Sequence, residues 1–103
     1  MREFSKMNKK QLIDHFIQKF EATDKETWCR NAFFQVRGNI QHCALGHCGN
    51  RSGHGNTKEA VALIGLFCGE DGMVYDVNDN IEGHPKDNIL EALYQMKKEL
   101  KTC

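Results

Sequence analysis

Thiol and imidazole side chains are concentrated in residues 42–48, whose sequence is HCALGHC. If this segment is helical, Cys43 and His47 lie four residues apart on one face, whereas Cys48 lies on another. A cysteine thiolate can act as a nucleophile when an imidazole takes its proton and a carboxylate or amide orients that imidazole. The pattern is therefore compatible with a cysteine-dependent hydrolase of the Cys/His type. Its candidate catalytic residues are Cys43, His47 or His84, and Asn78 or Asp79.

Zinc binding is a second chemistry open to the same side chains. A structural zinc ion takes four ligands, usually supplied as two close pairs. Cys43 and His47 would give one pair, but the second could come only from scattered residues, namely Cys29, His54, Cys68 or His84. A cysteine flanked by alanine and leucine is also typical of buried packing. We therefore expect no metal ion and no other cofactor, and catalysis by Cys43 is the alternative to a non-catalytic function.

A glycine-rich segment, residues 49–56, is the second candidate site. It contains three glycines and no apolar side chain, and it precedes a predicted helix. Such segments bind phosphate because small residues expose the backbone amides and the helix N-terminus is positive. The spacing matches neither the Walker motif nor the dinucleotide-binding fingerprint, so the alternative is an ordinary connecting loop. If the segment binds an anion, the candidate residues are Arg51, Gly53, His54 and Lys58.

Charge is balanced over the whole chain but not along it. The 14 basic and 14 acidic side chains cancel, which argues against a protein that coats nucleic acid or adheres to anionic membranes. Residues 30–58, however, contain four basic side chains and three histidines without a single carboxylate, whereas residues 69–88 contain six carboxylates and one lysine. The two blocks could face each other or simply be solvated, but the basic block also suits an anionic ligand.

Three further residues complete the candidate ligand-binding set: Trp28, Asn78 and Asp79. Asn78 and Asp79 follow a predicted strand, and such residues commonly bond to their own backbone and form a turn. Trp28 is the only tryptophan in the chain and is expected in the core or in the wall of a site.

Helices are predicted by apolar spacing and capping residues along most of the chain. Apolar residues at intervals of three and four predict an amphipathic helix over 8–21 and another from residue 85 onward, which Pro85 would begin. A third predicted helix, over 58–68 with Asn56 or Thr57 as its N-cap, is apolar on nearly every side and is expected at the centre of the core. Shorter helical segments are expected over 23–29 and 40–48. Short strands are expected over 33–36, where the same residues could instead continue the preceding helix, and over 73–77.

These elements predict a single α+β domain spanning residues 1–103. It would be mostly helical, with about four helices and a small two-stranded β element. Residues 1–7 are expected to form a disordered or extraneous N-terminal extension. The opening residues lack the apolar segment of an export signal and the five cysteines suggest reduced thiols, so we expect a cytoplasmic protein with no membrane association.

Four short motifs together resemble a family of small uncharacterised domains found in bacteria and their phages. The motifs are Trp28 with Cys29, CALG at 43–46, VND at 77–79 and ILEAL at 89–93. The resemblance covers roughly residues 27–97, although this chain has Val77 where many members have tryptophan. It implies a fold rather than a reaction, with Cys43, Gly46, Asn78 and Asp79 close together in space.

We therefore predict a small, non-catalytic cytosolic binding protein. It would bind a host macromolecule, such as a host protein, or a small anionic or nucleotide ligand through the basic glycine-rich loop at residues 49–58. The resemblance suggests a phage-type accessory or host-interaction (anti-defence) factor. The sequence leaves the oligomeric state open, with a homodimer as one option.

Overall fold

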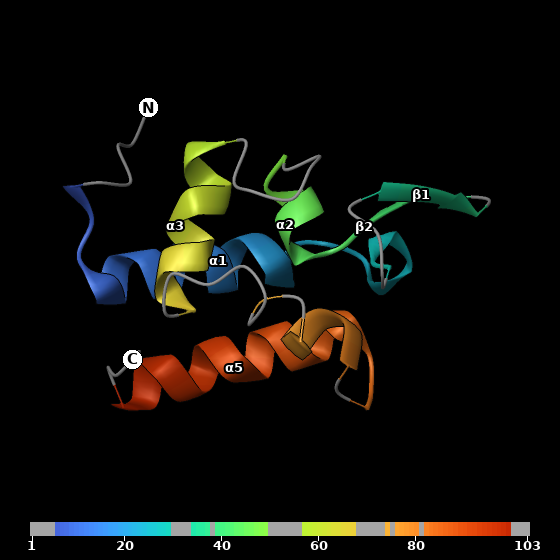
Figure 1. The fold of residues 1–103 in the computed structure, drawn as a ribbon. Helices are drawn as coiled ribbons and strands as arrows, with labels where there is room; N and C mark the ends of the chain where they lie inside the picture. The colour runs from blue at the N-terminus through green and yellow to red at the C-terminus, as the bar shows by residue number, and fades with distance from the viewer. Residues whose placement is uncertain are drawn as a thin grey trace.

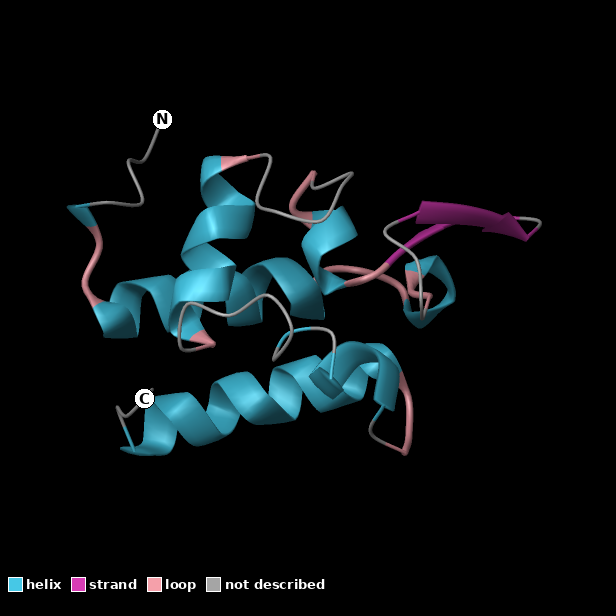
Figure 2. Cartoon of the chain, viewed as in Figure 1, coloured by secondary structure: helices cyan, strands magenta, loops and turns pink. Residues whose placement is uncertain are grey.

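The computed structural model describes residues 6–29, 34–37, 39–49, 57–67, 74, 76–80 and 82–99. This part of the chain is mostly helical, as predicted (Figure 2). The elements are, in chain order, α1 (Lys9–Glu21), the 3-10 turn η2 (Lys25–Thr27), β1 (Phe34–Arg37), β2 (Asn39–His42), α2 (Ala44–His47), α3 (Lys58–Leu66), the π-helical turn η3 (Asp76–Asn80) and α5 (Pro85–Glu99). Within the described residues, no helix is long and apolar enough to cross a membrane. Most of the predicted extension, residues 1–7, lies outside the described residues.

Helix α1 begins where the sequence predicts it. The Asn8 side chain accepts a hydrogen bond from the Gln11 backbone N–H at 2.8 Å, and the Gln11 side chain accepts one from the Asn8 N–H at 3.0 Å. This reciprocal pair satisfies two amides that a helix start leaves without partners. The apolar stripe is buried as expected, and it consists of Ile13, Phe16, Ile17 and Phe20.

Helix α1, not α3, occupies the centre of the core. It packs against both α3 and α5; α5 runs antiparallel beside it and α3 crosses it steeply (Figure 1). Helix α3 buries Ala60, Leu63 and Leu66, whereas Val61 is 56% exposed and Gly65 is exposed. The prediction of a central helix over 58–68 was therefore wrong. An apolar composition on all sides did not distinguish a helix with one open face from one that is fully enclosed.

Helix α5 begins at Pro85 as predicted and buries Ile89, Leu90 and Leu93. Polar contacts fix it along α1. Lys97 Nζ lies 2.8 Å from Asp14 Oδ1, and the Tyr94 hydroxyl donates to Glu21 Oε2 at 3.0 Å. Both contacts are exposed and contribute little to stability compared with the buried apolar stripe.

Strands β1 and β2 form an antiparallel pair, with Phe34 opposite His42 and Arg37 opposite Asn39. The pair lies to one side of the helices in Figure 1. Strand β1 falls close to the predicted strand over 33–36. Strand β2, in contrast, occupies the start of the segment predicted to be helical over 40–48, of which only Ala44–His47 is α-helical.

Two further local predictions were wrong. The helix expected over 23–29 is only the three-residue turn η2, and Trp28 is already extended, with φ −108° and ψ 141°. In the segment expected to form a strand over 73–77, the described residues Val74, Asp76 and Val77 are helical. Alternation of apolar and polar residues over five positions was too short a signal to separate a strand from a turn whose shape is set by distant contacts.

Candidate functional site

The side-chain amide of Asn78 joins three segments of the chain. Asn78, in η3, is 1% exposed. Its Oδ1 accepts a hydrogen bond from the Ala44 backbone N–H at 3.1 Å, and its Nδ2 donates to the Cys29 carbonyl at 3.0 Å. The same Nδ2 also donates to Asp79 Oδ1 at 2.6 Å. We call Cys29, Cys43, Ala44, Asn78 and Asp79 the Asn78 junction.

The Asn78 amide lies between two extended segments, where a backbone hydrogen bond would otherwise join them. Trp28 pairs with His42 as a parallel bridge, and the Cys29 N–H donates to the His42 carbonyl at 2.9 Å. In a parallel ladder the next bond would run from the Ala44 N–H to the Cys29 carbonyl. Asn78 instead satisfies both of these buried backbone groups with one side chain. The junction therefore depends on a residue more than thirty positions away along the chain.

Cys43 is the N-cap of α2 and is poorly suited to nucleophilic catalysis. Cys43 is only 3% exposed. Its Sγ accepts a hydrogen bond from the Gly46 N–H at 3.4 Å. Burial raises the pKa of Cys43, the N–H groups of Gly46 and Leu45 partly oppose that effect, and nearby Asp79 raises the pKa further. A catalytic thiol needs the reverse, an accessible sulfur with a lowered pKa.

His47 lies at the other end of α2, packed between aromatic rings. Its ring centroid lies 4.6 Å from that of Trp28 and 5.3 Å from that of His42. The Nε2 atom is buried and has no hydrogen-bond partner. Burial, followed by the neighbouring His42, lowers the pKa of His47 to about 4, so the ring is neutral at pH 7.

His84 lies at the start of α5, where its Nδ1 accepts a hydrogen bond from the Lys86 backbone N–H at 3.1 Å. Of the candidate catalytic residues, the structure brings Cys43, Asn78 and Asp79 together, and it gives both His47 and His84 other surroundings. Within the described part of the chain, no three His, Cys, Asp or Glu side chains are arranged to hold a metal ion.

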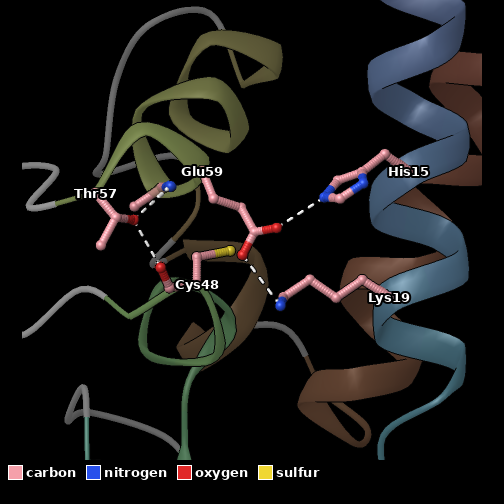
Figure 3. A network of polar contacts seen from close by, with 6 residues as sticks. His15, Lys19, Cys48, Thr57 and Glu59 are labelled. Carbon is pink, nitrogen blue, oxygen red and sulfur yellow. Dashed lines mark hydrogen bonds and ion pairs between the residues drawn. The ribbon is translucent and has the colours of Figure 1, made fainter. Parts of the chain in front are cut away.

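The two residues that flank the glycine-rich segment, Cys48 and Thr57, are joined by a hydrogen bond. The Thr57 hydroxyl donates to the Cys48 carbonyl at 2.6 Å and accepts from the Ala60 N–H at 3.0 Å, which caps α3 (Figure 3). Gly49 has φ +86°, and a Cβ added there would lie 3.1 Å from Thr57 Cγ2. We call Cys48, Gly49 and Thr57 the loop stem. Residues 50–56 themselves, with the candidates Arg51, Gly53 and His54, lie outside the described residues.

Glu59, in the first turn of α3, lies between α1 and Cys48 of the loop stem, and after burial it is the main cause that raises the pKa of the Cys48 thiol. Its Oε2 lies 2.7 Å from His15 Nε2 and its Oε1 lies 3.0 Å from Lys19 Nζ (Figure 3). The carboxylate nearest to the basic segment in the sequence is thus paired with two groups of another helix. Lys58, the first residue of α3, is exposed.

Of the remaining candidate ligand residues, Trp28 and Asn78 are buried and Asp79 is partly buried. Trp28 is 4% exposed, its Nε1 donates to Thr23 Oγ1 at 2.8 Å, and its ring packs edge-on against Phe20. Asn78 makes long-range hydrogen bonds in place of the local turn suggested by its neighbours in the sequence. Sequence reasoning overlooked Cys29 in the junction, since nothing in its immediate neighbours indicates the parallel bridge beside it. No protein-family model, curated protein or solved structure matches this chain.

Proposed function

We propose that this chain is a small, non-catalytic binding protein that takes up an anionic, phosphate-bearing ligand at residues 49–58. The observation that carries the proposal is the closed loop stem. Thr57 bonds to the Cys48 carbonyl at 2.6 Å and also caps the nine-residue helix α3, so the basic glycine-rich segment begins and ends beside that helix start. The first N–H groups of a helix give its N-terminus a positive partial charge, which favours an anion.

The charge distribution supports the same ligand class. Residues 30–58 contain no Asp or Glu, so no carboxylate within this segment would repel an anion bound there. Glu59 would oppose such a ligand, but its two oxygens are held at 2.7 and 3.0 Å by His15 and Lys19 on α1. The exposed Lys58 adds a positive charge at the start of α3.

A catalytic role for Cys43 receives less support. The sulfur is buried, its pKa is raised, and its hydrogen bond comes from the Gly46 N–H rather than from an imidazole. The phage-type accessory role suggested by the resemblance is compatible with the proposal, because the phosphate group can belong to a host molecule.

The test is titration of the full chain with inorganic phosphate and with adenosine monophosphate, followed by calorimetry or NMR. Arg51→Ala and His54→Ala should each weaken binding by about tenfold, as expected for loss of one charge-assisted hydrogen bond. Lys98→Ala, an exposed lysine on α5, is the matched control and should leave binding unchanged. Equal affinity in all four proteins, or absence of binding at millimolar ligand, would end the proposal.

A further inference from the structure

Two of the three buried thiols described in the structure, Cys29 and Cys43, occupy neighbouring positions on adjacent extended segments. Trp28 and His42 pair in parallel, and the next residue on each segment is a cysteine. Trp28 is extended, with ψ 141°, and so is Cys43, with φ −80° and ψ −179°. In-register residues of a parallel pair project to the same face.

The usual spacing of paired strands is compatible with a disulfide. Paired strands lie about 4.8 Å apart, and disulfides join residues whose Cα atoms are about 4.4–6.8 Å apart. The direct bond from the Cys29 N–H to the His42 carbonyl, at 2.9 Å, keeps the segments close on one side of the cysteines. On the other side the Asn78 amide lies between the two segments and spaces them more widely.

From this register we infer that Cys29 and Cys43 are a disulfide-forming pair, a modification site that joins the two ends of the segment containing β1 and β2. The bond would close the chain from residue 29 to residue 43, which includes both strands. The neighbouring thiol Cys48 is a poor competitor for Cys43. It lies at the other end of α2, about 7.5 Å further along the helix axis and on a different face, beyond the reach of a disulfide.

The oxidant we name is a hydroperoxide. Burial raises the pKa of both thiols, and we assign the first step to Cys43 because the Gly46 N–H at 3.4 Å from its sulfur partly opposes that effect. Its sulfur attacks one peroxide oxygen, an S–O bond forms, the O–O bond breaks, and one water leaves. The Cys29 sulfur then attacks the sulfenic sulfur of Cys43, the S–S bond forms and a second water leaves. The two thiols lose two electrons and two protons, and one hydrogen peroxide becomes two water molecules.

Access sets the rate of this reaction. Cys29 and Cys43 are only 4% and 3% exposed, so the peroxide must wait for local opening of the junction. Once formed, the bond restricts the unfolded chain, and the melting temperature should rise by about 10 °C. Reduction with dithiothreitol should return it to the starting value.

The test is treatment of the full chain with hydrogen peroxide, alkylation of the remaining thiols, and mass spectrometry of the tryptic digest. We expect a loss of two hydrogen atoms and a cross-link between peptides 26–30 and 38–51. The second peptide contains both Cys43 and Cys48, so fragment ions must place the bond on Cys43. The cross-link should persist in Cys48→Ser and disappear in Cys29→Ser and Cys43→Ser.

Three outcomes would overturn the inference. One is a bond placed on Cys48 in the wild-type digest, a readout that does not depend on how the variants fold. Another is oxidation of Cys29 and Cys43 to separate sulfinic acids without a cross-link. The third is a wild-type chain in which both thiols stay reduced even when mild urea opens the junction. None of these results depends on anion binding, so the inference and the proposed function fail separately.

Discussion

Replacement of Asn78 by alanine is the sharpest test of the Asn78 junction. The substitution removes the partners of two buried backbone groups, the Ala44 N–H and the Cys29 carbonyl, which Asn78 holds at 3.1 and 3.0 Å. A buried polar group left without a partner costs about 1–3 kcal/mol, so the two together should lower the free energy of unfolding by about 4 kcal/mol. Domains of this size are stable by only about 5–15 kcal/mol, and the variant should melt far below the wild type.

The assay is urea unfolding followed by circular dichroism, with the midpoint and slope fitted for both proteins. Gln95→Ala, an exposed amide on α5, is the control and should change stability by less than about 0.5 kcal/mol. A loss below about 1 kcal/mol in Asn78→Ala would refute the argument that its amide replaces a ladder hydrogen bond.

The Asn78→Asp variant keeps the hydrogen-bond acceptor of the side chain and removes its donor. The carboxylate still accepts from the Ala44 N–H, but it cannot donate to the Cys29 carbonyl. It also places an oxygen beside Asp79 Oδ1, in the position where the wild-type amide nitrogen lies 2.6 Å from that atom. We expect destabilisation that becomes smaller at acidic pH, as one carboxyl takes up a proton that the two oxygens can share. Equal loss at pH 5 and pH 8 would contradict this explanation.

Three other predictions concern α2 and α3. His47 has a pKa of about 4 in the folded chain against an ordinary 6.5, so the unfolded chain binds a proton at this residue more readily. The free energy of unfolding should therefore fall by about 2–3 kcal/mol as the pH drops from about 6.5 to 4. In His47→Gln the urea midpoint should depend less on pH. Thr57→Val removes both the α3 cap and the hydrogen bond to the Cys48 carbonyl, so it should lower the free energy of unfolding in urea by about 1–2 kcal/mol. Thr57→Ser keeps the hydroxyl and should retain most of the wild-type stability. Glu59→Gln breaks partly exposed ion pairs, so its melting temperature should fall by only a few degrees, and a larger fall would show that these pairs matter more than their exposure indicates.

The helices that could be predicted from the sequence are those with local signals at their ends. Asn8 with Gln11 specifies the start of α1, and Pro85 specifies the start of α5, because these residues satisfy or avoid the unpaired amides of a first turn. Thr57, one of two candidate caps, proved to be the cap of α3. Each of these signals acts within a few residues and is visible without knowledge of the fold.

Strand β2, the parallel bridge and η3 could not be predicted in the same way. His42 is extended because it pairs with Phe34 and Trp28, and the turn around Asn78 is fixed by the Cys29 carbonyl and the Ala44 N–H. These contacts join residues far apart in the chain, and no local propensity specifies them. The candidate site shows the same division, since the alanine and leucine beside Cys43 indicated a buried thiol, whereas the parallel bridge next to Cys29 had no local signal.

The buried position of Trp28 makes the chain a single-tryptophan fluorescence reporter. The ring centroid of the indole lies 4.6 Å from that of His47 and 5.2 Å from that of Phe20, and its N–H donates to the Thr23 hydroxyl. Because there is one tryptophan in the sequence, the whole indole signal comes from the boundary between α1, η2 and α2, one residue before Cys29. With excitation selective for indole, emission wavelength and intensity therefore report on the region that carries the Asn78 junction, with no label and no second indole in the molecule.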